Sequence, residues 1–168
     1  MCPNILALIE VDERANQVVE SLKLPGHNVV ACSNYKDAIG LIENTSFALI
    51  ISDVHLENGG SVFDFLRWAK RNPLTCDTPF VLYSCNPTST ARYLEDGVRC
   101  SARLLGATEY IVMDNFDSND FRRRISLVCP PIPKVSSAYP KKKPLRDLHK
   151  FRTTTYLGDP CQSALYPR

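Results

Sequence analysis

The sequence predicts a doubly wound α/β fold, in which a five-stranded parallel sheet is covered by helices on both faces. Three observations support this prediction. Short apolar segments alternate five times with segments whose apolar residues recur at helical spacing. The apolar segments are continuous, which is typical of strands buried on both faces. The helical segments have the length of crossover connections between parallel strands.

The first half of the chain holds three of the expected strands. The run NILALI at 4–9 is a buried strand, and the helix that follows it ends at Pro25 and Gly26. Asn34 is placed to cap a second helix with an apolar stripe. The strands expected here cover residues 4–9, 28–31 and 47–52, and the helices cover residues 13–24 and 35–43.

The second half continues the alternation. Pro73 ends the third helix, and Pro79 is tolerated at the first position of the fourth strand. Gly97 weakens the fourth helix, and Asp117 or Ser118 caps the fifth. The helices expected here cover residues 61–71, 88–106 and 118–128, and the strands cover residues 79–84 and 109–113.

Charge and composition divide the chain into a folded domain over 1–128 and a basic tail over 129–168. The tail carries a net charge of +6 and seven of the twelve prolines, whereas the preceding residues carry −4. We expect the tail to be extended and partly disordered. Its lysines could attract nucleic acid, but no folded nucleic-acid module accompanies them, so a solvated tail is the favoured interpretation.

The remaining composition favours a cytoplasmic protein. The seven cysteines are scattered and form no C-x-x-C pair, which argues against a disulfide framework or a zinc site. No apolar run approaches the length of a membrane span, and the N-terminus lacks the features of a secretory signal.

Polar residues follow three of the expected strands. Glu10 and Asp12 follow the first strand, Asp53 the third, and Ser84 ends the fourth. The carboxyl ends of parallel strands meet at one edge of the sheet, where ligands bind in such folds. Carboxylates gathered there suit Mg²⁺, and an aspartate beside the metal can attack a phosphoryl group. Asp53 alone would more often be a turn residue, but its polar neighbours favour a nucleophile.

Residues 4–128 resemble a response-regulator receiver domain, the flavodoxin-like module with strand order 2-1-3-4-5. The likeness lies in IISDVHLENGGSVFDFL, LYSC and GATEYIVM. It implies that Asp53 accepts a phosphoryl group, that Ser84 is the switch hydroxyl and that Tyr110 is the aromatic residue whose rotamer follows the switch. It also implies a Mg²⁺ site formed by Glu10, Asp12, Asp53 and the backbone carbonyl of His55.

Several positions depart from the receiver pattern. Val11 falls on the second acid of the first strand end, and Met113 falls on the lysine after the fifth strand. Asp114 would add repulsion near a phosphoryl dianion. Glu57 replaces the usual proline, and the segment from Ser84 to Met113 is several residues longer than in the family.

Two functions follow from the resemblance, neither of them enzymatic. In the first, an atypical receiver accepts phosphate on Asp53 from a histidine kinase or phosphotransfer protein and signals through the face formed by helix 4, strand 5 and helix 5. A homodimer through that face is one alternative. In the second, a pseudo-receiver acts as a phosphorylation-independent interaction module. A flavodoxin that binds flavin is disfavoured because EVDERANQ is acidic where a phosphate loop would be needed.

Overall fold

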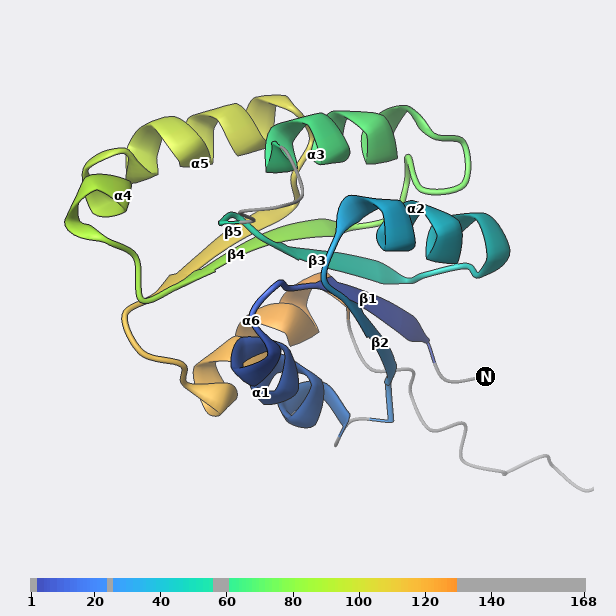
Figure 1. The fold of residues 1–168 in the computed structure, drawn as a ribbon, viewed down its shortest axis with the longest axis horizontal. Helices are drawn as coiled ribbons and strands as arrows, with labels where there is room; N and C mark the ends of the chain where they lie inside the picture. Colours follow the sequence, from blue (N-terminus) through green and yellow to red (C-terminus); the bar gives the residue numbers. More distant parts are fainter. Residues whose placement is uncertain (1–2, 24–25, 56–60, 130–168) are drawn as a thin grey trace, which may run out of the picture. The chain divides into compact units, whose positions relative to one another are not determined.

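A parallel sheet of five strands in the order β2-β1-β3-β4-β5 confirms the predicted topology (Figure 1). The strands are β1 (Asn4–Leu8), β2 (Asn28–Cys32), β3 (Leu49–Asp53), β4 (Phe80–Cys85) and β5 (Glu109–Met113). This computed structural model describes residues 3–23, 26–55 and 61–129, which all belong to one unit, Met1–Pro133. The predicted tail lies outside the described residues, except for Cys129.

Helices cover both faces of the sheet, with α1 and α6 on one face and α2, α3 and α5 on the other (Figure 1). The helices are α1 (Asp12–Lys23), α2 (Tyr35–Asn44), α3 (Val62–Arg71), α4 (Ser89–Tyr93), α5 (Glu95–Leu104) and α6 (Ser118–Val128). None of the helices in the described part of the chain has the length and apolar content needed to cross a membrane.

Successive residues of each strand point to opposite faces, which explains why the strands are apolar throughout. In β1, Ile5 and Ala7 pack with α1 and α6, whereas Leu6 and Leu8 pack with α2 and α3. All four side chains are fully buried. Asp53 is the last residue of β3 and Ser84 is the second-last residue of β4, so both lie near the carboxyl ends of these strands.

Side-chain caps fix the starts of several helices. Asn34 Oδ1 accepts a hydrogen bond from the Asp37 backbone N–H at 2.9 Å, as predicted. The Asp117 carboxylate caps α6 by accepting from two backbone N–H groups, and the Thr88 hydroxyl caps α4. These caps satisfy backbone donors that a helix terminus leaves without partners.

The fourth helix differs from the prediction, because the chain forms two helices where the spacing predicts one over 88–106. The break lies at Leu94, between α4 and α5, and Gly97 lies inside α5. α4 buries none of its residues, whereas Ala102 anchors α5 against the sheet. Packing against the sheet therefore fixes the position of α5 but not that of α4. This difference in packing decides where the helix breaks more than the low helix propensity of Gly97 does.

Candidate functional site

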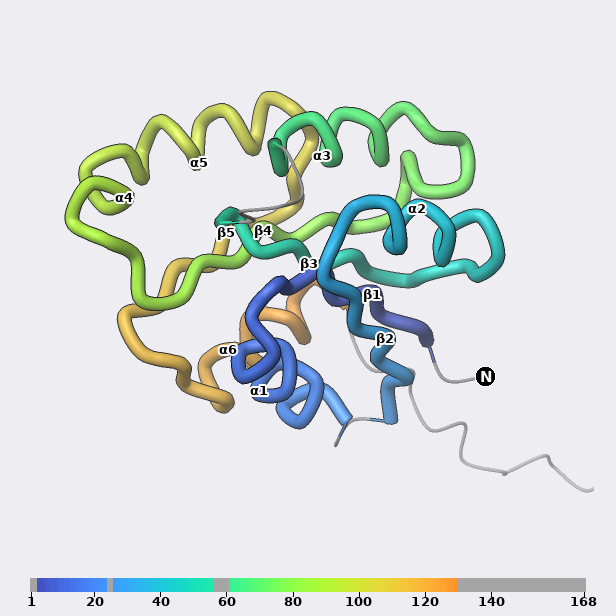
Figure 2. Tube along the Cα trace, in the orientation of Figure 1, coloured from blue at the N-terminus to red at the C-terminus, as the bar shows by residue number. Residues whose placement is uncertain are grey.

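The site is built around Asp53, which is the last residue of β3 rather than the first residue beyond it. Its side chain is only 1% exposed. The His55 backbone N–H donates a hydrogen bond to Asp53 Oδ1 at 2.9 Å, which orients the carboxylate. The other oxygen, Oδ2, has no hydrogen-bond partner among the described residues. Figure 2 shows that the chain leaves β4 and β5 at the same edge of the sheet.

Arg14 supplies the positive charge nearest to Asp53 in the described structure. Its Nη1 lies 3.5 Å from Asp53 Oδ2, which is an ion pair without hydrogen-bond geometry. At an effective dielectric constant of about 20, the gross attraction at this distance is on the order of 4–5 kcal/mol. The net contribution is smaller, because Arg14 is 29% exposed and both groups lose hydration.

Burial raises the pKa of the Asp53 carboxyl above its ordinary value of 3.8. The His55 backbone N–H and the Arg14 guanidinium favour the carboxylate and oppose this shift, but they do not cancel it. Desolvation is therefore the dominant influence on Asp53. A buried carboxylate with a raised pKa and a polar edge around it is typical of functional sites.

Ser84 follows the residue of β4 that pairs with Asp53, and Tyr110 lies one strand further away, on β5. Ser84 is fully buried, and its Oγ has no hydrogen-bond partner within the part of the chain that the structure describes. Burial raises the pKa of the Tyr110 hydroxyl, and the nearby Ser84 hydroxyl lowers it in part. Tyr110 is 7% exposed, so its ring belongs to the core at the level of Ser84.

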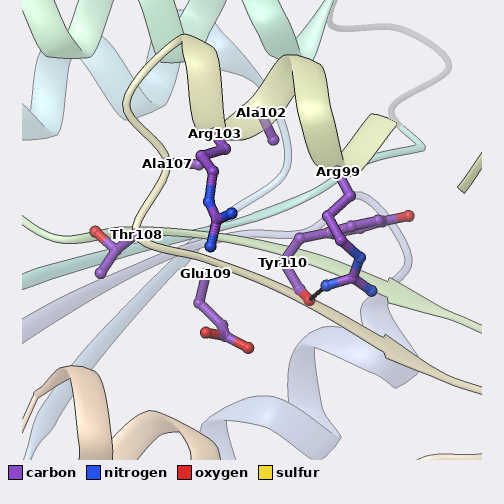
Figure 3. Close-up of a pocket in the computed structure, with 7 residues that line it drawn as sticks. All are labelled: Arg99, Ala102, Arg103, Ala107, Thr108, Glu109 and Tyr110. Atoms are coloured by element: carbon purple, nitrogen blue, oxygen red, sulfur yellow. Dashed lines mark hydrogen bonds between the residues drawn. The ribbon is translucent and has the colours of Figure 1, made fainter. Parts of the chain in front are cut away.

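Arg99 of α5 contacts both the ring and the backbone of Tyr110 (Figure 3). Its guanidinium carbon lies 5.2 Å from the ring centre, within the range of a cation–π contact. Its Nη1 donates a hydrogen bond to the Tyr110 backbone carbonyl at 3.2 Å, and its Nη2 pairs with Glu95 at 2.8 Å. A small hollow of about 110 Å³ lies beside these groups and is also lined by Arg103 and Glu109.

A larger hollow of about 600 Å³ opens at the carboxyl edge of the sheet. It is lined by Glu10, Val11, Arg14, Val54, His55, Cys85, Asn86 and Thr88. Of the residues predicted for the site, Glu10 and His55 line this hollow. Asp12 begins α1, where its side chain is exposed and does not line the hollow.

The described side chains at this edge offer few ligands for a divalent cation. No group of three or more His, Cys, Asp or Glu side chains that could hold a metal ion occurs in residues 3–23, 26–55 and 61–129. Val11 is 45% exposed and offers no oxygen ligand where the resemblance implies an acid. Mg²⁺ is usually held by one or two carboxylates, with waters and phosphate oxygens completing an octahedron, and the described side chains bring Glu10 and Asp53 to the edge.

Met113 and Asp114 end β5 in different environments. Met113 is 7% exposed and packs in the core with α1 and α6. Unlike the implied lysine, its side chain carries no charge. The Asp114 carboxylate pairs with Arg92 of α4 at 2.7 Å. The expected repulsion between Asp114 and a phosphoryl group is therefore reduced by the Arg92 charge. No residue takes the place of the implied lysine on β5 itself.

Sequence analysis missed three residues of this site. Arg14 was not selected, although it is the only base in the acidic segment EVDER and lies four residues after Glu10. The Tyr35 hydroxyl has its pKa raised to about 12 by burial and by the charges of Asp64, Asp53 and Glu10. Asn86 adopts a φ of 54°, a left-handed conformation that asparagine tolerates better than most residues.

Comparisons with known proteins show the fold of this chain. No family model matches it, and no curated protein matches it. The chemotaxis response regulator CheY4 of Vibrio cholerae is similar, with a TM-score of 0.65, 20% identity, and coverage of 76% of this chain and 99% of that chain. The signal receiver domain of a signal transduction histidine kinase from Syntrophus aciditrophicus has a TM-score of 0.63 and 19% identity, and the match covers 81% of this chain and 96% of that one.

A third similar structure is a sensor protein from Polaromonas sp. JS666, with a TM-score of 0.63 and 18% identity. The match covers 76% of this chain and 95% of that chain. At these identities the likeness establishes architecture and not activity. The chain has the flavodoxin-like fold of receiver domains.

Proposed function

We propose that the chain is an atypical response-regulator receiver in phosphorelay signal transduction, which accepts a phosphoryl group on Asp53 and signals through protein contacts. One observation carries this proposal. Asp53 Oδ2 and Ser84 Oγ are both buried near the ends of adjacent strands, and neither makes a hydrogen bond of regular geometry among the described residues, although Arg14 lies beside Oδ2 and the Tyr110 hydroxyl lies near Ser84. Buried polar atoms without partners cost stability, so their retention indicates a ligand that uses them.

The chemistry requires a nucleophile and a group that binds the transferred oxygens. An oxygen of the Asp53 carboxylate attacks the phosphorus of a phosphohistidine on a histidine kinase or phosphotransfer protein. The P–O bond to Asp53 forms, the P–N bond breaks, and the imidazole nitrogen takes up a proton. The Ser84 hydroxyl then donates a hydrogen bond to a phosphoryl oxygen. This charged oxygen is a strong acceptor for the buried hydroxyl.

Tyr110 and Arg99 provide a route for the signal to the surface. When Ser84 turns toward a phosphoryl oxygen, its effect on the Tyr110 hydroxyl is lost, and Tyr110 in turn contacts Arg99 of α5. The outer surface of α4 and α5 exposes large apolar side chains, which suit a downstream protein partner. These side chains are Tyr93 (88% exposed), Leu94 (53%) and Leu104 (82%).

A second function has support from two other positions. Val11 and Met113 replace the acid and the lysine that the resemblance implies, so a phosphorylation-independent pseudo-receiver would bind partners with the same α4–α5 surface. This candidate requires no reaction at Asp53. It predicts an intact fold, partner binding through α4 and α5, and no covalent phosphate.

The two functions are separated by treating the full chain with acetyl phosphate and measuring its intact mass. We expect the wild type to gain one phosphoryl group that hydroxylamine removes, because an acyl phosphate is labile to this reagent. Asp53→Asn should gain none, and Ser84→Ala should react about tenfold more slowly, the loss expected for one charge-assisted hydrogen bond. Equal reactivity of the wild type and Asp53→Asn would refute the assignment and favour the pseudo-receiver.

A further inference from the structure

The charges around Asp53 differ from those that a metal-dependent site needs. We propose that Arg14 takes the place of a divalent cation as the counter-charge of the Asp53 site, so that the site works without metal. The inference rests on the proposed function only for the identity of the ligand, a phosphoryl group. Arg14 is assigned as a binding residue that contacts this group directly.

The position of Arg14 has no explanation in the stability of its own helix. It lies in the first turn of α1, where the backbone N–H groups already make the helix terminus positive. A cation is disfavoured at such a terminus, whereas the preceding Asp12 and Glu13 are favoured there. The contact that Arg14 makes with Asp53 Oδ2, at 3.5 Å, accounts for its location.

The geometry of Arg14 suits an added phosphoryl group better than it suits the bare carboxylate. The 3.5 Å separation and the lack of hydrogen-bond geometry leave the pair loose at Asp53 Oδ2. A phosphoryl group on Asp53 would bring oxygens into the hollow that Arg14 lines together with His55. The planar guanidinium can donate two parallel hydrogen bonds to phosphate oxygens, which is the arrangement that arginine forms most readily.

Arg14 also opposes the binding of a divalent cation at the same carboxylate. Its charge lies on the oxygen that a metal would need, and the two cations would repel each other. Glu10 is the acid among the residues that line the hollow, whereas Asp12 does not line it and Val11 carries no charge. Arg14 therefore supplies a positive charge at a site where Met113 provides no lysine and Val11 provides no acid to hold a metal ion.

The first part of the test measures phosphoryl acceptance by the full chain from acetyl phosphate, with either EDTA or Mg²⁺ present. An Asp53 oxygen forms the new bond to phosphorus, the bond from phosphorus to the acetate oxygen breaks, and acetate leaves. We expect the wild-type rate to be the same, within about twofold, in both buffers. Arg14→Gln should lower the rate about tenfold and Arg14→Lys should lower it less, because lysine keeps the charge but loses the fork.

The matched control is Arg67→Gln, which removes a charge from an exposed ion pair with Asp64 on α3. We expect this variant to react like the wild type. Amide spectra and thermal midpoints of all the variants verify that they are folded. A wild-type rate that needs Mg²⁺, or an Arg14→Gln rate equal to that of the wild type, overturns the inference and leaves the proposed function standing.

The second part is an amide NMR titration of the full chain with Mg²⁺ alone, which does not depend on phosphoryl transfer. We expect no saturable shifts centred on Asp53 and His55 in the wild type. Saturable shifts there would overturn the inference whatever the first part gives. If no variant accepts a phosphoryl group, the proposed function fails, and the titration still decides whether Arg14 keeps Mg²⁺ from the site.

Discussion

Replacing Asp53 by asparagine should stabilise the fold at neutral pH. The carboxylate is 1% exposed, and its Oδ2 has no hydrogen-bond partner in the described residues. Asparagine has almost the same shape but carries no charge, so it removes the desolvation cost while filling the same space. The oxygen that accepts from the His55 backbone N–H is retained as the amide carbonyl.

The size of the gain follows from two opposing contributions. A buried charged acceptor without a partner costs about 1–3 kcal/mol or more, and the neutral amide lowers this cost while its NH₂ group takes the place of Oδ2. The substitution also removes the Arg14 ion pair, which is loose at 3.5 Å and partly exposed, and is therefore worth about 0–1 kcal/mol. We expect a net increase of about 1–2 kcal/mol in the free energy of unfolding. For a domain of this size, this raises Tm by about 4–8 °C.

The gain should depend on pH with a defined sign. The folded state raises the pKa of Asp53 above 3.8, so between that value and the folded pKa it binds more protons than the unfolded state does. Wild-type stability at this group is therefore fully present at low pH and is lost as pH rises through the folded pKa. Asp53→Asn has no such loss, so its advantage over the wild type should increase across this window.

The assay is urea unfolding of both proteins at a series of pH values, monitored by the fluorescence of Trp68, with unchanged slopes confirming a two-state comparison. Asp64→Asn is the control, because its side chain is 70% exposed and forms an exposed ion pair with Arg67. A destabilised Asp53→Asn, or an advantage that is equal at low and neutral pH, would show that desolvation does not dominate at this carboxyl.

Two further predictions concern the elements around the site. Phe121→Ala should lower the free energy of unfolding by about 3–5 kcal/mol in the same assay, because the ring is fully buried and its centre lies 5.4 Å from that of Tyr83. Leu127→Ala, at a side chain 78% exposed, should change it by less than about 0.5 kcal/mol. Arg92→Ala should lower the free energy of unfolding by less than about 1 kcal/mol, because the ion pair between Arg92 and Asp114 is exposed. High salt should remove this difference in stability between the variant and the wild type. A larger loss that does not depend on salt would contradict the prediction.

The parallel α/β architecture could be predicted because the pattern of apolar residues reflects burial directly, whereas the strand order is what the resemblance to receiver domains implies. Residues Ile5 to Leu8 are apolar without interruption since both faces of β1 are covered, and β3 and β4 show the same pattern. Capping at Asn34 and Asp117 was also predictable, because these side chains satisfy local backbone donors. The break at Leu94 was not, since it depends on which helical turns find a surface to pack against.

The site was harder to predict because strand ends identify positions but not side-chain directions. Ser84 and Tyr110 lie near each other on β4 and β5, whereas Asp12 is exposed at the start of α1 and does not line the hollow at this edge. Arg14 lies on a helix rather than at a strand end, and only the helical turn brings it to the carboxylate. The pattern of carboxylates at strand ends therefore does not indicate Arg14.

The stability cost at the site and the proposed chemistry have one physical origin. Desolvation of the Asp53 carboxylate destabilises the fold and also leaves one of its oxygens available for reaction. The Ser84 hydroxyl on the neighbouring strand is buried without a regular hydrogen bond. A protein selected for stability alone would carry an amide or an apolar pair at these positions. A phosphoryl group placed between them would give Ser84 an acceptor and Arg14 a fully formed partner. The free energy that the unliganded fold lacks would then favour the liganded state, as a switch between two states requires.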